Sequence, residues 1–297
     1  MIKNCKKIKK VKHLIRKANQ PKWLHHFGPK KYELADHILA LLVKQECKLS
    51  YRRTTRLLSD FGIKTPKYNT LCVAKKRIPL HIWQQFLWAS IKGNVHLAAI
   101  DGSGMSRPLP SPHYYKRIDK PYPIEVPLKL SMVIDTKSKQ ILALRLRAKS
   151  AHDSRDVKYL VNRLKDKPTK LIADKGYDAE WIHQFCKSKG IFAVIPIRNW
   201  GKVRHKNFSL RRLSQKMWTQ NTYGRREMVE AAFSAIKRKF GCSVSSHSMC
   251  RMRAEMYLRA IAHNLELLIQ RLFEQSRFLC THKKVSDISE ILFLPLA

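Results

Sequence analysis

The sequence predicts an α/β protein in which a mixed β-sheet with flanking helices follows a helical N-terminal region. Residues 33–92 show helical periodicity in their apolar positions. From residue 94 onwards, short apolar runs of strand length alternate with amphipathic helices. The first runs follow one another as a meander, and the later ones are separated by helices, as in βαβ units. These patterns divide the chain into residues 1–93 and 94–297.

The N-terminal region begins with basic residues. Residues 1 to about 30 contain no acidic side chain and are expected to form a loosely ordered basic arm. Helical spacing of apolar residues predicts a helix over residues 33–46 and another over about 80–92.

Two short helices are predicted between these. Ser50 can cap the first, which runs through Leu58, and Asp60-Phe61-Gly62 forms a turn. The second is predicted over residues 67–77. A glycine turn before a basic helix suits a helix-turn-helix that docks in the major groove, although helix pairs with a glycine turn are common. In the DNA-binding interpretation the second helix exposes Asn69, Thr70, Lys75, Lys76 and Arg77.

Five strands and several helices are predicted after residue 94. Residues 135–138 form a tight turn between the second and third strands. The helix after the third strand begins at Ser150 or Asp153 and carries apolar side chains along one side. The strands are predicted over residues 95–100, 128–134, 140–146, 170–173 and 191–195. Helices are predicted over about 153–164, 178–189, 222–240 and 251–273.

The charge balance is extreme, because 60 Lys and Arg against 21 Asp and Glu give a net charge of +39. The basic residues cluster before Glu33 and again between Trp181 and Arg226, a stretch without acidic residues. Such a field favours polyanions, of which nucleic acid is the abundant one. Basic tails also serve as solubilising arms. We nevertheless expect contact with DNA or RNA.

The seven cysteines are scattered and form no CxxC pair. This pattern argues against a disulfide framework and fits a reducing cytoplasm. Cys242, His247 and Cys250 lie close enough to suggest zinc, but a fourth ligand is not evident. No apolar run reaches the roughly 18 residues that span a bilayer. A basic amphipathic arm can also bind a membrane surface, but the rest of the chain favours nucleic acid, and we expect no membrane partner.

Four polar side chains fall on one line of the predicted helix near residue 230: Tyr223, Arg226, Glu230 and Lys237. At 3.6 residues per turn, their spacing keeps them within an arc of about 60°. The helix is bounded by Asn221 or Thr222 as a cap and by Gly241. Its buried face is predicted to contain Met228, Val229, Ala232, Phe233, Ile236 and Phe240. An ordinary surface helix also mixes charges, so other acidic residues decide the interpretation.

Two predicted strands end in an aspartate, Asp101 and Asp174. Sites in α/β sheets form where strand ends open into crevices, so the two share a site if their strands are neighbours. Glu230 could reach it from a helix packed on the sheet. Each aspartate alone could instead form a turn. Three converging carboxylates repel one another unless divalent cations neutralise them, and two Mg²⁺ ions held in this way support phosphodiester chemistry.

These motifs resemble the DDE transposases of bacterial and archaeal insertion sequences. The segment Ala-Asp-Lys-Gly-Tyr-Asp at residues 173–178 is similar to the hallmark around the second Asp of that family. The four aligned residues match its Tyr-Arg-Glu-Lys signature at every interval. Asp101 falls where the first acidic residue lies, although Gly-Ser-Gly follows it where relatives more often have a hydroxyl residue. The resemblance covers about residues 94–270.

The resemblance implies a ribonuclease H-like catalytic domain over residues 94–297, preceded by a basic arm and helical DNA-binding region over residues 1–93. It implies nicking at transposon ends, followed by attack of the freed 3′-hydroxyl on target DNA. The implied partners are double-stranded DNA at the ends and target and a second copy in a homodimer on DNA, in the cytoplasm at the nucleoid. Two alternatives remain: a catalytically silent, site-specific DNA-binding protein of this ancestry, and a ribonuclease H-like nuclease that does not join strands.

The resemblance also assigns roles to residues. Two Mg²⁺ ions, for which Mn²⁺ can substitute, would be held by the catalytic residues Asp101, Asp174 and Glu230. Phosphates of the bound end would be contacted by Tyr223, Arg226 and Lys237, of which Arg offers a fork and Lys a point charge. Too few residues separate Asp174 from Glu230 for the large β-rich insertion of some relatives, so a hairpin intermediate is left open. Trp200 and Trp218 could stack on a base or belong to the core, and Asp153 could cap a helix or position metal or water.

Overall fold

A computed structural model describes residues 6–24, 30–109, 111–121, 123, 126–148, 151–197, 209–217 and 219–291. Side chains are described in these ranges except for residues 6–9 and 275–291. Trp200 and Trp218 lie outside the described residues, as does Ser150.

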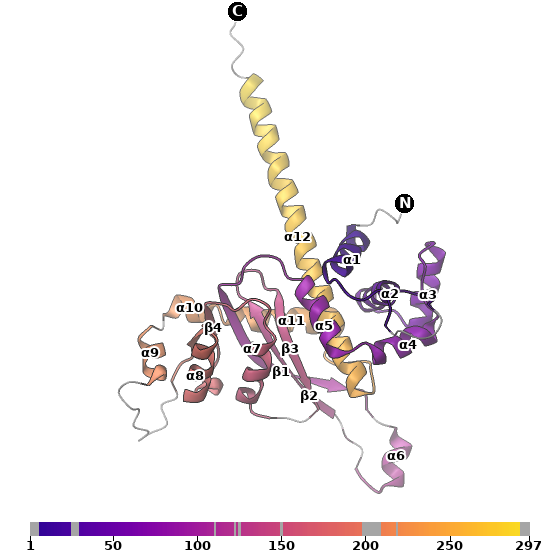
Figure 1. Cartoon of the computed structure of the whole chain (residues 1–297), viewed down its shortest axis with the longest axis horizontal. Helices are drawn as coiled ribbons and strands as arrows, with labels where there is room; N and C mark the ends of the chain where they lie inside the picture. Colours follow the sequence, from indigo (N-terminus) through magenta and orange to yellow (C-terminus); the bar gives the residue numbers. More distant parts are fainter. Residues whose placement is uncertain are drawn as a thin grey trace, which may run out of the picture.

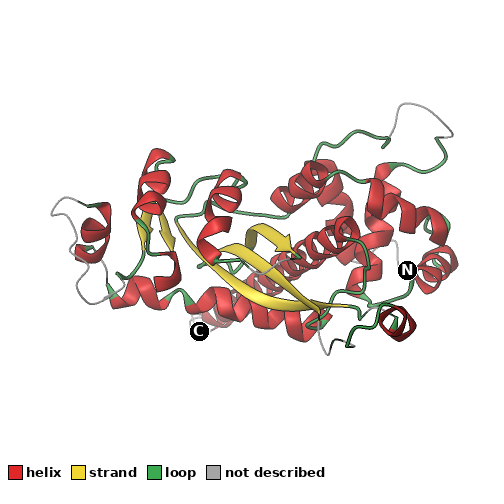
Figure 2. Cartoon of the chain, turned by 90° about the horizontal axis from the view of Figure 1, so that it is seen from below, coloured by secondary structure: helices red, strands yellow, loops and turns green. Residues whose placement is uncertain are grey.

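The described strands form one mixed sheet with the order β3-β2-β1-β4-β5. Figure 2 shows these strands in yellow with helices around them. β1, β2 and β3 pair antiparallel, whereas β4 and β5 continue the sheet in parallel from β1. This confirms the predicted α/β class, a mixed sheet with flanking helices. The strands are β1 Leu97–Arg107, β2 Val126–Asp135, β3 Ile141–Arg147, β4 Lys170–Ile172 and β5 Phe192–Val194.

Helices cover both faces of the sheet because successive side chains of a strand point to opposite sides. Ala99 of β1 packs into a core with α11 and α12, whereas Ala98 and Ile100 pack into a second core with α7 and α8. The helices after β1 are α6 Pro112–Arg117, α7 Val157–Asn162, α8 Glu180–Ser188, α9 Leu210–Lys216, α10 Gln220–Gly224, α11 Glu227–Phe240 and α12 Met249–Ile291, with 3₁₀ helices η2 Asp153–Asp156 and η3 Lys175–Tyr177.

The N-terminal region is helical, as predicted. Its helices are α1 Lys6–Lys17, α2 Leu34–Glu46, α3 Tyr51–Asp60, α4 Tyr68–Arg77 and α5 Leu80–Ala89. Ser50 caps α3 by accepting a hydrogen bond from the Arg53 N–H at 3.2 Å. Gly62 takes a positive φ of 64° in the turn that follows, a conformation that favours glycine.

Two expectations about this region are wrong. Residues 6–17 are not part of a loose arm but form α1, because Val11 and Leu14 give the helix an apolar side that is buried. Lys75 is not exposed on α4; it is buried and paired with Glu255 of α12. The exposed residues of α4 include Asn69, Thr70, Lys76 and Arg77.

One hydrophobic core runs across residue 93. It joins α2 and α5 of the helical region to the sheet, α11 and α12. α12 is longer than the predicted helix, and its C-terminal part extends away from the rest of the chain (Figure 1). The two parts of the chain on either side of residue 93 therefore share a core. The division into domains at this residue stays a prediction. Within the part of the chain that the structure describes, no helix has the length and apolarity needed to cross a bilayer.

Candidate active site

Asp101 lies inside β1 and not at its end, which corrects the prediction from the sequence. β1 pairs with β4 only over residues 97–99, but its antiparallel pairing with β2 continues to Arg107. The long ladder with β2 keeps the Gly-Ser-Gly segment extended, where local composition had indicated a turn. Asp101 therefore sits just beyond the point where β1 loses its neighbour β4.

Asp174 follows β4 and precedes the 3₁₀ helix η3, as the N-cap position of that helix. β4 is the parallel neighbour of β1. The negative charge of the Asp174 carboxylate contributes to a raised pKa of Asp101, so the two side chains interact electrostatically. The strands that precede or contain these two acidic residues are therefore neighbours, which was the condition for a shared site.

The predicted line of four polar residues does not lie on one helix. Tyr223 belongs to α10, Arg226 is the residue before α11, and Glu230 and Lys237 lie on α11. Thr219, rather than Asn221 or Thr222, caps α10 by accepting the Thr222 N–H at 3.3 Å. The chain turns between α10 and α11, directly after Gly224. Glycine has a low helix propensity, which is consistent with a break at this point. The predicted buried face agrees with the structure except that Met228 is only partly buried. The helix ends at Gly241 as predicted, with a φ of 88° at that residue.

Two of the four residues, Arg226 and Lys237, nevertheless contact β1 directly. The Arg226 guanidinium lies between two carboxylates, with Nη1 3.4 Å from Asp101 Oδ2 and Nη2 2.7 Å from Glu230 Oε1. Lys237 Nζ donates to Ser103 Oγ at 2.8 Å, two residues further along β1. Arg226, just before α11, and Lys237 of α11 thus place their side chains on the segment of β1 that begins at Asp101.

Burial shapes the protonation of this group. The pKa of Asp101 is raised chiefly by burial, and Asp153 and Asp174 add to the increase, while the Gly102 N–H and Arg226 oppose it. Burial also raises the pKa of Tyr223, whose hydroxyl hydrogen-bonds to Asp174. An ionised Asp101 is therefore costly here, and a cation beside it lowers that cost.

The donor set suits a hard divalent cation. Carboxylate oxygens are the ligands that Mg²⁺ prefers, and the Arg226 guanidinium already provides a positive charge between Asp101 and Glu230. In the arrangement described, no three His, Cys, Asp or Glu side chains among residues with a defined placement are close enough to hold one ion. The same holds for Cys242, His247 and Cys250, so the described structure does not support zinc there.

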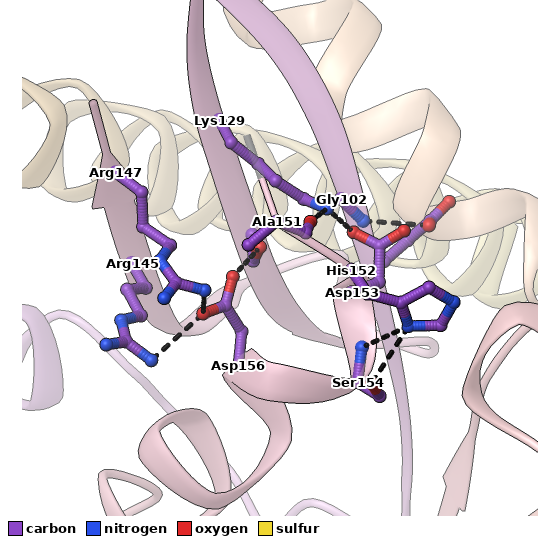
Figure 3. Close-up of polar contacts among 11 residues, drawn as sticks. Gly102, Lys129, Arg145, Arg147, Ala151, His152, Asp153, Ser154 and Asp156 are labelled. Carbon is purple, nitrogen blue, oxygen red and sulfur yellow. Dashed lines mark hydrogen bonds and ion pairs between the residues drawn. The ribbon is translucent and has the colours of Figure 1, made fainter. Parts of the chain in front are cut away.

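Asp153 lies near the candidate site, and its contacts there were not predicted from the sequence. It was expected to cap a helix, but His152 is the N-cap residue of η2. The Asp153 carboxylate instead forms an ion pair with Lys129 of β2 (Figure 3). It also lies close enough to Asp101 to raise its pKa. Its position beside Lys129 depends on β2, which is distant in sequence, and no local pattern marks that contact.

Comparison with known proteins identifies the family. Residues 97–265 match the family described as "Transposase DDE domain". A cryo-EM structure of a piggyBac transposase synaptic complex with hairpin DNA is similar at 12% sequence identity and a TM-score of 0.45, covering 99% of this chain and 80% of that chain. No curated protein sequence matches. Since the family match spans more than half of the chain and includes the three acidic residues, this protein belongs to the DDE transposases.

Proposed function

We propose that this transposase cleaves phosphodiester bonds at the ends of a mobile element and joins the 3′-hydroxyl to target DNA. In this proposal the catalytic residues are Asp101, Asp174 and Glu230. The alternatives of a silent DNA-binding protein and of a nuclease that does not join strands make different products, which the experiment below separates.

The observation that carries the proposal is the position of Arg226. Its guanidinium is shared by Asp101 of the sheet and Glu230 of α11, residues far apart in sequence. Tyr223 bonds to Asp174 from the neighbouring helix. These contacts link Asp101 to Glu230 and Tyr223 to Asp174, which supports a common role for the three acidic residues.

Asp101, Asp174 and Glu230 would hold two Mg²⁺ ions, with Mn²⁺ as a substitute. When bound, such ions activate a water or a 3′-hydroxyl and stabilise the leaving oxygen of an in-line displacement. For the ions to enter, Arg226 has to leave the carboxylates. A guanidinium released in this way can bind a phosphate with two parallel hydrogen bonds.

Tyr223, Arg226 and Lys237 would then bind phosphates of the transposon end. The cationic groups of Arg226 and Lys237 contact Asp101 and Ser103 of β1, so a DNA strand that reached Asp101 would pass close to them. The exposed basic side of α4 and the net charge of +39 would supply further contacts with double-stranded DNA. We propose that the protein works as a homodimer on DNA, in the cytoplasm at the nucleoid.

The test uses a plasmid that carries the element with its native flanking DNA. Purified protein with Mg²⁺ is expected to produce nicks at the ends and joined products in target DNA. Asp101→Ala, Asp174→Ala and Glu230→Ala are each expected to abolish both products while DNA binding remains. Nicks without joined products would instead favour a nuclease, and binding without nicks would favour a silent protein.

A further inference from the structure

A pocket lined in part by polar side chains lies next to Asp101, on the opposite face of β1. A pocket of about 270 Å³ is lined by Gly102, Ser103 and Gly104 of β1, by Lys129 of β2 and by Asp153 of η2, together with Pro127 and Leu128. Gly102 directly follows Asp101, and successive residues of a strand point to opposite faces. The pocket therefore adjoins the candidate active site through the backbone of β1.

Two glycines form the floor of this pocket. A Cβ at Gly102 would collide with the Asp153 carboxylate and lie 3.3 Å from Lys129 Cε, so both side chains rest directly on the strand backbone. A Cβ at Gly104 would meet nothing within 4 Å, so the space above that residue is open. Glycine at these positions allows close approach of a ligand to the backbone.

The cation in the pocket lining is Lys129. Its ammonium group pairs with Asp153 and donates a hydrogen bond to the Ala151 carbonyl oxygen (Figure 3). The Lys129 side chain is 16% exposed and that of Asp153 35%. The pair is therefore held in place yet remains reachable from solvent.

Asp153 owes its position to Asp156, which is fully buried at the other end of η2. The Asp156 carboxylate accepts hydrogen bonds from Arg145 Nη1 and Arg147 Nη1, both at 2.9 Å, and from Ser131 Oγ at 2.6 Å (Figure 3). These bonds fasten η2 to β2 and β3. Asp156 thus fixes η2 to the sheet, whereas Asp153, among the described residues, has Lys129 as its one ionic partner and lies at the rim of the pocket.

We propose that this glycine-floored pocket binds a phosphate of a DNA strand that passes Asp101, that Lys129 is its ligand, and that Asp153 holds Lys129 when DNA is absent. The proposal rests on the transposase function proposed above. A phosphodiester oxygen carries the same sign of charge as the Asp153 carboxylate and accepts the same hydrogen bonds. It can therefore replace Asp153 on Lys129 while the lysine keeps its place against the strand.

The first test compares charge variants. Binding is measured by fluorescence anisotropy without divalent cations, on a labelled duplex with a thymidine tail at its 3′ end. Lys129→Met is expected to weaken binding about tenfold and to lower the slope of log affinity against log salt by about one. The matched control is Lys137→Met, an exposed lysine in the turn at the far end of β2, which should change affinity far less.

Asp153→Asn is expected to act in the opposite direction. It frees Lys129 without removing it, so DNA binding should strengthen a few-fold, and the double variant should bind like Lys129→Met alone. Equal effects of Lys129→Met and Lys137→Met would overturn the role of Lys129. Weaker binding by Asp153→Asn would overturn the holding role of Asp153.

A second test locates the phosphate. Tails with one neutral methylphosphonate at successive positions should show one position at which the wild type loses affinity and Lys129→Met does not. If Lys129→Met fails to fold, Gly104→Val provides the test, because it fills the open space above residue 104 and leaves Lys129 in place. This variant should bind the single-stranded tail more weakly. Wild-type affinity in Gly104→Val would overturn the proposal that the pocket binds a phosphate. Cleavage by the wild type with Mg²⁺, measured separately, shows whether the proposed function itself has failed.

Discussion

The buried ion pair between Lys75 and Glu255 gives the sharpest prediction about stability. Lys75 Nζ lies 3.3 Å from Glu255 Oε2, and their side chains are 2% and 1% exposed. Lys75 also donates to Ser246 Oγ at 2.8 Å. This contact joins α4 of the helical region to α12 and to the loop that precedes it. Removing Glu255 leaves the buried Lys75 without its counterion, whereas removing Lys75 leaves Glu255 with only Arg259.

The two replacements are expected to differ. In Lys75→Met, Glu255 keeps Arg259 Nη2 at 2.8 Å, so the loss should be near the lower end of the usual cost of breaking a buried pair, about 3 kcal/mol. In Glu255→Gln, two buried cations face each other without an anion, so the loss should approach about 5 kcal/mol. The matched control is Lys76→Met, the exposed neighbour on α4, which should stay within about 0.5 kcal/mol of the wild type.

Urea unfolding followed by tryptophan fluorescence measures these differences, because a shift of the midpoint at constant slope reports stability. A Lys75→Met variant as stable as Lys76→Met would refute the reasoning. So would a Glu255→Gln variant that is more stable than Lys75→Met.

Three further predictions concern charge and capping. Burial raises the pKa of Asp101, so the ionised form of this residue at neutral pH opposes folding. Asp101→Asn should therefore not lower Tm in EDTA. It should, however, abolish the rise in Tm that Mg²⁺ gives the wild type, which corresponds to about 2.7 kcal/mol at 100 times Kd. Burial alone would raise the pKa of Glu255, but its partners lower it to about 2. The ionised Glu255 therefore contributes its full stabilisation above the unfolded-state pKa of 4.5, and this contribution is lost as the pH falls towards 2. In Glu255→Gln, the free energy of unfolding should depend on pH less steeply between these two values, by the equivalent of one bound proton. Ser50→Ala removes the cap of α3 and should cost about 1 kcal/mol in urea unfolding, whereas Ser50→Asp should cost little.

Much of the fold could be predicted from local patterns. Strand-length apolar runs located all five strands, and the spacing of Val229, Phe233 and Ile236 located the buried side of α11. The apolar runs that precede Asp101 and Asp174 indicated the candidate site, because β1 and β4 are parallel neighbours, although β1 continues beyond Asp101. These features depend on periodicity and on chain order, which a sequence displays directly.

The errors arose where distant partners override local preference. Gly-Ser-Gly after Asp101 has turn composition, but pairing with β2 keeps it in a strand. Lys75 has the sequence context of an exposed helix residue, but it is buried and pairs with Glu255, which lies 180 positions later in the chain. The pair of Asp153 and Lys129 has the same origin. None of these contacts leaves a signal in the neighbouring residues.

The central claim is that Asp101, Asp174 and Glu230 bind divalent cations together beside a DNA strand. Binding of Mn²⁺ to the protein on DNA, measured by electron paramagnetic resonance, tests this without relying on turnover. We expect the wild type to take up Mn²⁺ that Mg²⁺ displaces, and each single alanine variant of the three to lose most of that uptake. Uptake that is undiminished in all three variants would contradict the account.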